Sequence, residues 1–496
     1  MYLGIDIGTG STKAVLTDGD GNILAQSSRT HRAQMPAPGH VEFDAEGVWW
    51  AEVAALSREL LGGTAGDDAG GPGIDPSRLR GVAVSGLGPC LVLTDETLTP
   101  LRPAILYGVD TRSEQQVRDL EEGFGAEEIL ASSGSELSSQ ALGPKIRWVR
   151  DNEPEIFARA TRWFSASNFI LAKLTGEYVL DQHSASQTDP LHDLEAGAWI
   201  AERSEAVAEH LPMPRLAWST EVAGQVTAEA AELTGIPAGT PVTAGTVDAW
   251  AEAFSAGVRS PGDLMLMYGS TFFFVEQLSG AARHPGLWAT RGTEPGSFSL
   301  AAGMATSGSI VNWFQEFVGG LSLQQLSEEA AGVAPGSEGV MVLPYFAGER
   351  TPIFDPQARG TITGLTLSHG RGHVLRAIYE GMACGVAQIL ELMEGTAERP
   401  ERLVCVGGGT KSPLWAQIVS DVTGREQQVP EQTIGASYGD ALMAAIAVGD
   451  VSPETDWTRI ERTVVPDPAN AEVYAKLLET YTQAYPAMRE TMHRLA

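Results

Sequence analysis

The chain has 496 residues, of which 43% are hydrophobic and 19% are charged, a balance typical of globular proteins. At about 150 residues per domain, this length allows two to three domains. The chain carries 33 Lys and Arg against 63 Asp and Glu, which gives a formal net charge of −30. A field of that sign repels phosphate backbones and anionic lipid, so we expect neither a nucleic acid nor a membrane as partner.

Cysteine usage and the first residues indicate a reducing compartment. Cys90, Cys384 and Cys405 lie far apart and form no CxxC pair, which disfavours a disulfide framework and a thiolate zinc site. The first apolar run lacks a basic region before it and meets Asp6 almost at once, unlike a signal peptide. The sequence has no apolar run of about 18 residues that could span a membrane. We therefore predict a cytoplasmic α/β protein.

Apolar runs of strand length alternate with segments of helical period along the first half of the chain. Residues 2–7, 14–17 and 23–27 are predicted strands separated by turn residues. Asp44 is expected to cap a helix whose apolar residues extend to Leu60. A Gly- and Asp-rich stretch then predicts a surface loop over 62–76, followed by a strand over 79–84, a turn over 85–89 and a strand over 91–93.

A similar pattern begins near residue 240. A strand over 241–244 leads into GTVD (245–248) and a helix over 249–256. Further strands over 264–268 and 403–406 each end in a glycine-containing turn. We therefore predict two α/β domains, 1–240 and 241–496, with a long packing helix over 471–495.

The turn after the first strand is a candidate phosphate site, although two common nucleotide motifs are absent. Lys13 and Lys411 each follow a threonine, so neither completes a Walker A loop, and no GxGxxG segment opens a helix after the first strand. A Gly/Thr/Ser turn between two strands can still hold phosphate with backbone N–H groups and hydroxyls. Asp6, at the strand end, would face that phosphate and hold Mg²⁺ through water. The alternative interpretation is a plain hairpin.

Glycine-rich strand ends at 269–271 and 407–412 favour a nucleotide bound between the two domains. DIGTGSTK (6–13) resembles the first phosphate loop of the FGGY carbohydrate kinases, within the superfamily of actin, sugar kinases and chaperone ATPases. The resemblance covers nearly the whole chain. GGGTKSPLW (407–415) is similar to the adenosine-side loop of xylulokinase-like members.

Two signatures of that family can be compared residue by residue. GTITGL (360–365), followed by HV and by AIYE (377–380), satisfies the second signature throughout. KIRWVRDN (145–152) satisfies the back half of the first signature. Gln140 and Leu142 break its front half, where an aromatic or small residue and Pro, Ser or Thr are usual.

The resemblance implies two actin-like (ribonuclease H-like) domains with a cleft between them, and ATP- and Mg²⁺-dependent phosphorylation of a primary hydroxyl of a small sugar. Asp248, in GTVD, is then the catalytic base, and Asp6 is the residue that holds the metal. The residues implied to bind ATP are Gly8, Thr9, Gly10, Ser11, Thr12, Lys13, Gly269, Ser270, Thr271, Gly308, Asn312, Gly408, Gly409, Thr410 and Ser412. The residues implied to bind the sugar are Gly88, Pro89, Tyr107, Asp110, Gln140 and Asp248.

The segment SGLGPC (85–90) departs from the pattern of the family and limits the substrate prediction. Xylulokinases carry Ser-Gly-Gln-Met-His-Gly there, and glycerol kinases carry an Arg-Glu pair. The side chain of Pro89 makes no hydrogen bond, and loss of such a group changes substrate preference strongly. A pentulose such as xylulose is the first expectation, and ribulose, another ketose or polyol, a tetritol or glycerol are the alternatives.

Two other classes of protein compete with the kinase interpretation. In a chaperone- or actin-like ATPase, nucleotide drives a conformational change, but the match over 360–380 and the Asp248 motif favour the kinase. A sugar sensor without catalysis would lack Asp6 or Asp248, and both are present. Small-molecule sugar and ATP are the expected partners, and a homodimer is a further expectation because homodimers are frequent in the resembled family.

Overall fold

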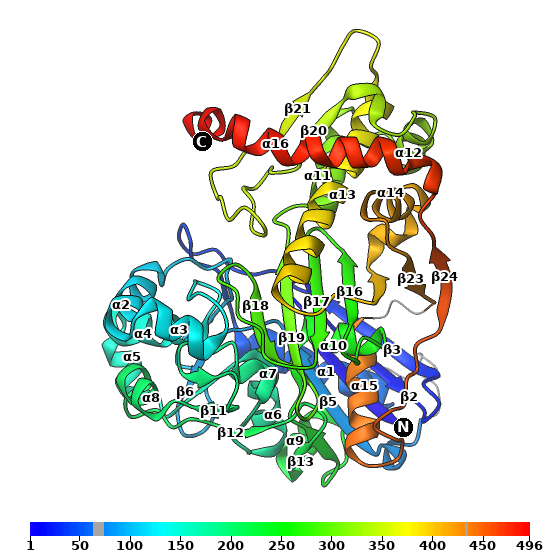
Figure 1. Cartoon of the computed structure of the whole chain (residues 1–496). Helices are drawn as coiled ribbons and strands as arrows, with labels where there is room; N and C mark the ends of the chain where they lie inside the picture. Colours follow the sequence, from blue (N-terminus) through cyan, green and yellow to red (C-terminus); the bar gives the residue numbers. More distant parts are fainter. Residues whose placement is uncertain (63–73, 432–434) are drawn as a thin grey trace.

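The structure, a computed structural model, describes residues 1–62, 74–431 and 435–496 (Figure 1). Residues 63–73 of the predicted loop lie outside this part of the chain. Two seven-stranded mixed sheets organise the two halves, as the α/β prediction requires. No helix in the described ranges is long and apolar enough to cross a membrane.

The first sheet has the strand order β13-β14-β5-β1-β2-β3, and β15 pairs beside β5. β1 is antiparallel to β2 and parallel to β5, so a hairpin is followed by a crossover. The strands predicted at 2–7, 14–17, 23–27 and 79–84 all belong to this sheet. Its members are β1 (Tyr2–Ile7), β2 (Ser11–Thr17), β3 (Ile23–Thr30), β5 (Gly81–Gly86), β13 (Val222–Gln225), β14 (Pro241–Thr243) and β15 (Thr246–Val247).

Successive residues of β1 face opposite sides of this sheet, because side chains alternate along a strand. The odd-numbered residues pack in a core with α1 (Ala51–Leu60) and α6 (Ala166–Thr175). Tyr2 packs on the other side with α10 (Asp248–Ser255) and α15 (Ala436–Ala447). Asp6 shares the side of Tyr2, and its register partner Lys13 on β2 shares it too.

The helix predicted after Asp44 begins as a π-helical segment, η1 (Ala45–Trp50), and continues as α1. Asp44 accepts a hydrogen bond from the Gly47 N–H at 2.8 Å, which confirms it as the cap. The cap fixes the direction in which α1 leaves, across the back of β2 and β3.

The second sheet repeats the central strand arrangement of the first, and its strand order is β18-β19-β17-β16-β22-β23-β24. β16 is antiparallel to β17 and parallel to β22, just as β1 is to β2 and β5. The members are β16 (Asp263–Tyr268), β17 (Phe272–Leu278), β18 (Trp288–Arg291), β19 (Phe298–Gly303), β22 (Arg402–Val406), β23 (Gln427–Pro430) and β24 (Ile460–Val464). Its helices are α11 (Gly308–Phe317), α12 (Leu323–Ala331), α13 (Arg371–Thr396), α14 (Pro413–Thr423) and the predicted terminal helix, α16 (Ala471–Leu495).

A helical layer with its own core lies beside the first sheet and is coloured cyan to green in Figure 1. It contains α2 (Glu114–Phe124), α3 (Ala126–Ser133), α4 (Leu142–Asn152), α5 (Pro154–Arg159) and α8 (Ala201–Ala208). The shorter elements of the first half are β4 (Glu42–Phe43), η2 (Pro76–Arg78), β6 (Val92–Thr94), β7 (Ala104–Ile105), β8 (Arg162–Phe164), β9 (Val179–Asp181), α7 (Gln182–Ala185), β10 (His192–Asp193), β11 (Ala198–Trp199), β12 (Arg215–Ala217) and α9 (Ala228–Thr234). Those of the second half are η3 (Ser337–Gly339), β20 (Met341–Leu343), β21 (Thr361–Thr363), η4 (Gly408–Lys411) and η5 (Pro468–Asn470).

We propose that the two domains meet between β15 and β16, slightly after the predicted boundary near residue 240. β14 and β15 follow that residue, yet both pair with β5 of the first sheet. Helix α15 also packs on the first sheet, although it lies far along the chain (Figure 1). Gly4 permits this close approach, because a Cβ there would lie 1.9 Å from the carbonyl oxygen of Ser437.

Candidate active site

The ends of three adjacent strands bring the predicted base and the predicted metal residue to one edge of the first sheet. Asp6 of β1 is in register with Ser85 of β5, and Ser85 is in register with Thr246 of β15. Asp248 follows β15 directly as the first residue of α10, where its Oδ1 accepts the Ala249 N–H at 2.7 Å. This arrangement is the strand-to-helix position in which the sequence placed the base.

Carboxyl groups gather around Asp6, with Lys13 as the cation among them. Burial, with Asp248 as the next cause, raises the pKa of Asp6 well above its usual range, and Lys13 opposes the shift. Burial also raises the pKa of Asp248 to about 6 and that of Glu252 to about 7. Sequence reasoning missed Glu252, although it stands four residues after Asp248 and therefore on the same face of α10.

A fourth carboxyl group, Asp440 of α15, reaches the same place from far along the chain. Asp440 is fully buried and accepts the Ser85 hydroxyl at 2.6 Å and the Ser85 N–H at 3.2 Å. Burial raises its pKa, although the bonds from Ser85 oppose the shift. No motif identified this residue, because its place depends on the packing of α15 under β1 and β5.

Asp6 suits a magnesium ion. Its Oδ1 is buried and has no hydrogen-bond partner among the described residues. In the same part of the chain, no group of three His, Cys, Asp or Glu side chains could hold a metal ion. Mg²⁺ usually keeps several waters and binds through one or two carboxylates together with substrate phosphates, so it needs no such group.

The turn between β1 and β2 presents backbone N–H groups toward open space. Gly8 closes the turn by donating its N–H to the Ser11 carbonyl at 3.0 Å. Within the described ranges, the N–H groups of Thr9 and Gly10 donate to no backbone carbonyl. A Cβ at Gly10 would meet no atom within 4 Å. The turn therefore has both the free donors and the room that a phosphate group requires.

Two hydroxyls of this loop have partners that the sequence did not indicate. Thr12 is fully buried and its hydroxyl donates to Glu52 Oε2 at 2.6 Å, so the predicted phosphate contact of this hydroxyl is wrong. The reason is strand alternation: Lys13 shares the face of Asp6, and Thr12 therefore points the other way, to α1. The Thr9 hydroxyl lies 3.0 Å from that of Tyr107, which joins the turn to the predicted sugar segment.

Most residues predicted to contact sugar lie close to Asp248 or Tyr107. A Cβ at Gly88 would lie 3.0 Å from Val247, the residue before Asp248. Gln140 accepts the N–H of the residue after Tyr107 through its Oε1 at 3.0 Å. Burial raises the pKa of Tyr107, while the Thr9 bond and Arg350 of the second domain oppose the shift. Arg350 thus lies near the sugar segment, and no sequence motif had assigned it.

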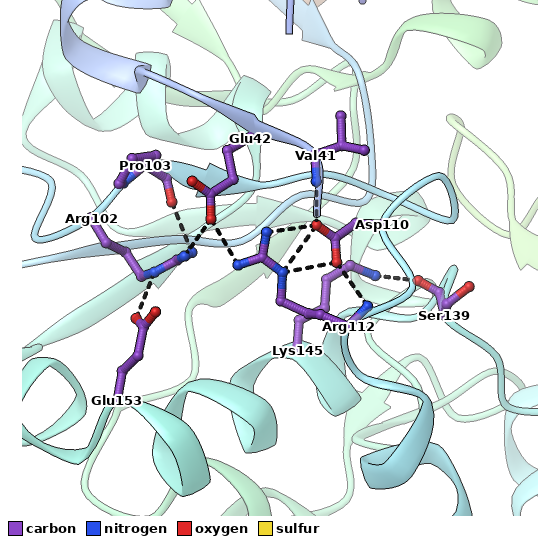
Figure 2. Close-up of polar contacts among 9 residues, drawn as sticks. All are labelled: Val41, Glu42, Arg102, Pro103, Asp110, Arg112, Ser139, Lys145 and Glu153. Atoms are coloured by element: carbon purple, nitrogen blue, oxygen red, sulfur yellow. Dashed lines mark hydrogen bonds and ion pairs between the residues drawn. The ribbon is translucent and has the colours of Figure 1, made fainter. Parts of the chain in front are cut away.

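Asp110 is the exception, because it anchors its own segment. It is fully buried, and its Oδ2 accepts Arg112 Nη2 and the Val41 N–H, each at 2.7 Å (Figure 2). Arg112 also donates to Glu42 at 2.7 Å, and Arg102 donates to the same carboxylate. The prediction that Asp110 contacts the sugar is therefore wrong, since the surrounding chain already occupies its oxygen atoms.

Lys145 lies beside this network and holds the segment that carries Gln140 (Figure 2). Its ammonium group donates to the carbonyl oxygens of Ser139 and Ala141. Burial lowers the pKa of Lys145 to about 8, and Asp110 opposes the shift. The lysine of the family signature is thus an internal brace for the loop before α4.

The segments of the second domain that were predicted to bind ATP also come together. The Gly308 N–H donates to the Gly269 carbonyl at 3.0 Å, and the Ser309 N–H donates to the Ser270 carbonyl at 3.2 Å. β16 and β22 are parallel neighbours, so the loops 269–271 and 407–412 leave the sheet side by side. Thr271 is half-buried in the first of these loops, and Asn312 is exposed on the first turns of α11.

The loop after β22 offers its backbone more than its side chains. Gly408 is exposed, and Gly409 has no room for a Cβ, which would lie 2.6 Å from the Trp415 ring. The Thr410 hydroxyl donates to the Gly407 carbonyl at 2.8 Å, and Ser412 caps α14. The predicted contacts of Thr410 and Ser412 would therefore have to use atoms that these local bonds leave free.

Comparisons with known proteins cover both halves of the chain. The FGGY family of carbohydrate kinases matches through its N-terminal domain over residues 1–255 and through its C-terminal domain over residues 264–448. The chain belongs to this family. It is 30% identical over 503 residues to the xylulose kinase of Lactococcus lactis, covering 99% of this chain and 98% of the relative. It is 28% identical over 500 residues to the xylulose kinase of Escherichia coli, covering 98% of each.

Solved structures agree with the sequence comparison. The crystal structure of xylulose kinase from Rhodospirillum rubrum matches with a TM-score of 0.89 at 34% identity and covers 99% of both chains. The protein is an ATP-dependent carbohydrate kinase with two actin-like domains, as the sequence motifs indicated. The alternatives of a chaperone-like ATPase and of a sugar sensor without catalysis are set aside.

Proposed function

We propose that this kinase transfers the γ-phosphoryl group of ATP to a primary hydroxyl of a pentulose such as xylulose, with Asp248 as the general base. The observation that supports this most is the place of Asp248, at the start of α10 and beside both Asp6 and the phosphate turn. The similarity to xylulose kinases supports the choice of a pentulose.

The reaction requires a general base for the sugar hydroxyl and hydrogen-bond donors that hold the phosphates. An alcohol has a pKa far above 7, so its attack on phosphorus benefits from a carboxylate that accepts the proton as the new bond forms. Burial raises the pKa of Asp248, which makes its carboxylate a stronger base than that of an ordinary aspartate. Asp6 would hold Mg²⁺, which when bound neutralises charge on the phosphates. The N–H groups of Thr9 and Gly10 would orient the γ-phosphate toward the sugar.

The polar side chains proposed to bind the sugar are Tyr107, Gln140 and Arg350, since the segment 87–90 offers none. Cys90 donates its Sγ–H to the Leu87 carbonyl at 3.2 Å, and Gly88 and Pro89 have no side-chain donor. A site with this set of donors should discriminate among sugars by hydroxyl position. Ribulose, tetritols and glycerol are the competing substrates.

The base assignment is tested with Asp248→Asn and a matched control, Glu252→Gln. Both changes replace a buried carboxyl group by an amide on the same face of α10, one helical turn apart. Asp248→Asn should lower kcat by about 10²–10⁴, which is about 3–5 kcal/mol, while binding of ATP is kept. Glu252→Gln should stay within about tenfold of native kcat. Equal losses in the two folded variants, or a small loss in Asp248→Asn, would overturn the assignment.

The substrate assignment is tested by ADP release over a panel of pentuloses, pentitols, tetritols and glycerol. The preferred compound should show a kcat/KM at least about tenfold above that of its epimers, a difference of about 1.4 kcal/mol. Preference for a non-pentulose would refute the pentulose proposal and leave the kinase assignment intact.

We also propose a cytoplasmic homodimer, an expectation that came from the resemblance to the family. Sedimentation equilibrium at micromolar concentration should give twice the mass of one chain. A single-chain mass would contradict the dimer.

A further inference from the structure

A histidine and a glutamate support the phosphate turn from behind, on the face of the first sheet opposite Asp6. His31 follows β3, and Glu52 lies on α1. The two side chains are 5% and 16% exposed, so both are largely out of water. Phe43 packs edge-on against the imidazole with the ring centres 5.0 Å apart.

His31 holds the turn at two carbonyl groups. Its backbone N–H donates to the Gly10 carbonyl at 3.1 Å, and its ring Nε2 lies 2.9 Å from the Gly8 carbonyl oxygen. The Gly8 carbonyl and the Thr9 N–H belong to one trans peptide group and point in opposite directions, so tying the carbonyl to the back turns the Thr9 N–H to the front. The Gly10 N–H also has no backbone acceptor among the described residues. Glu52 adds a third tie, since it accepts the Thr12 hydroxyl at 2.6 Å.

The two contacts of the ring fix its orientation. Nδ1 lies 2.8 Å from Glu52 Oε2, and Nε2 faces the Gly8 carbonyl. A carbonyl oxygen only accepts hydrogen bonds, so Nε2 carries the hydrogen that is donated to Gly8. Glu52 holds the opposite side of the ring and thereby keeps Nε2 aimed at the turn.

We propose that Glu52 orients the His31 ring and that this pair positions the turn for the phosphates of ATP. His31 and Glu52 are positioning residues, since they act through the backbone of Gly8 and Gly10 and through Thr12. The inference rests on the proposed function, which assigns the phosphates to this turn. It adds that nucleotide affinity depends on a pair of side chains behind the turn.

Other charged groups around His31 are already paired or face elsewhere. Arg29 of β3 pairs with Glu59 of α1, Glu42 of β4 pairs with Arg102 and Arg112, Lys13 of β2 faces Asp6 on the other side of the sheet, and Arg32 is exposed. Glu52 also lines a surface groove with Ser28 and Thr30.

The main test measures the affinity for a nonhydrolysable ATP analogue with excess Mg²⁺ by calorimetry, without sugar. His31→Leu removes both ring contacts and should weaken binding about tenfold at pH 7, with sugar affinity unchanged. Glu59→Gln, which breaks the exposed pair with Arg29 on the same two elements, is the matched control and should bind within twofold of native. Native-like binding by folded His31→Leu would overturn the proposal. If His31→Leu does not fold, His31→Gln takes its place, because its amide retains one N–H for Gly8. Native-like binding by folded His31→Gln would likewise overturn the proposal.

A second pair of variants tests the role of Glu52. In Glu52→Gln the amide can donate to Nδ1 and still accept from Thr12, so both ties survive, whereas Glu52→Leu removes both. Glu52→Leu should bind the ATP analogue about tenfold more weakly than Glu52→Gln at pH 7. Equal affinities of the two folded variants would overturn the role of Glu52. Gly10→Val separates the two proposals: if it leaves affinity unchanged, the phosphate role of the turn itself fails.

Discussion

Glu276 should make the second domain lose stability as the pH rises. It lies in the middle of β17, and neither carboxyl oxygen has a hydrogen-bond partner among the described residues. Its cross-strand partners are Leu264 and Leu300, both fully buried. Partners in register lie on one face of a sheet, so the carboxyl group sits between two leucines. Burial, with Glu398 as the second cause, raises its pKa from 4.5 to about 8.

The size and sign of the effect follow from that pKa. The folded protein keeps a proton on Glu276 between pH 4.5 and about 8, where the unfolded chain releases it. The free energy of unfolding therefore falls as the pH rises through this window. One pKa unit is worth about 1.36 kcal/mol, so the loss reaches up to about 5 kcal/mol above pH 8. Glu276→Gln removes the titration and should be up to that much more stable than native protein at pH 9.

Thermal unfolding at pH 5.5 and pH 9 checks this prediction. A domain of about 200 residues shifts its Tm by about 2–4 °C per kcal/mol, so a difference of up to about 5 kcal/mol should raise the Tm of Glu276→Gln by up to about 10–20 °C above native at pH 9. At pH 5.5 both side chains are neutral and similar in shape, and the two proteins should melt together. Glu461→Gln, at an exposed position of β24 in the same sheet, should change nothing. Equal melting of native and Glu276→Gln at pH 9 would show that the buried carboxylate finds a partner, and the reasoning would fail.

Two further predictions concern the phosphate turn and the metal. Gly10→Val places a branched side chain in the open space over the turn and should weaken ATP binding at least about tenfold, with sugar binding kept; calorimetry with each ligand checks this. Asp6→Asn should raise the Mg²⁺ concentration needed for half-maximal activity, because a charged oxygen ligand is lost, and a magnesium titration of the rate measures it. An unchanged magnesium requirement would contradict the role of Asp6.

The main elements of the fold could be predicted from the sequence because each strand is a short apolar run that ends in a glycine-rich turn. The hairpin of β1 and β2, the strand before Asp248 and the helix from Ala471 to Leu495 all appeared where local pattern placed them. The family signatures added what pattern cannot supply, namely that two distant strand ends serve one reaction. The kinase assignment depended on those motifs.

Local pattern could not indicate which distant helix covers a strand. Helix α15 looked like part of the second domain, yet it packs under β1 and brings Asp440 to Ser85. Its close approach depends on Gly4, and in the sequence Gly4 is one glycine among 56. Asp110 was also misjudged, because only the folded chain shows that Arg112 and the Val41 N–H already occupy its carboxylate.

The alternation of β2 explains why two neighbouring residues of the phosphate turn have different partners. Lys13 points to the side of Asp6, where a cation offsets crowded carboxylates, while Thr12 points to Glu52 behind the turn. The two residues are neighbours in a motif read as one phosphate loop, but a strand separates them onto opposite faces. The face of the sheet that carries Asp6 and Lys13 is therefore free for the proposed ligand, because the hydrogen bonds that shape the turn lie on the opposite face. A one-residue slip of β2 would exchange these tasks, so the register of this hairpin matters as much as the residues in it.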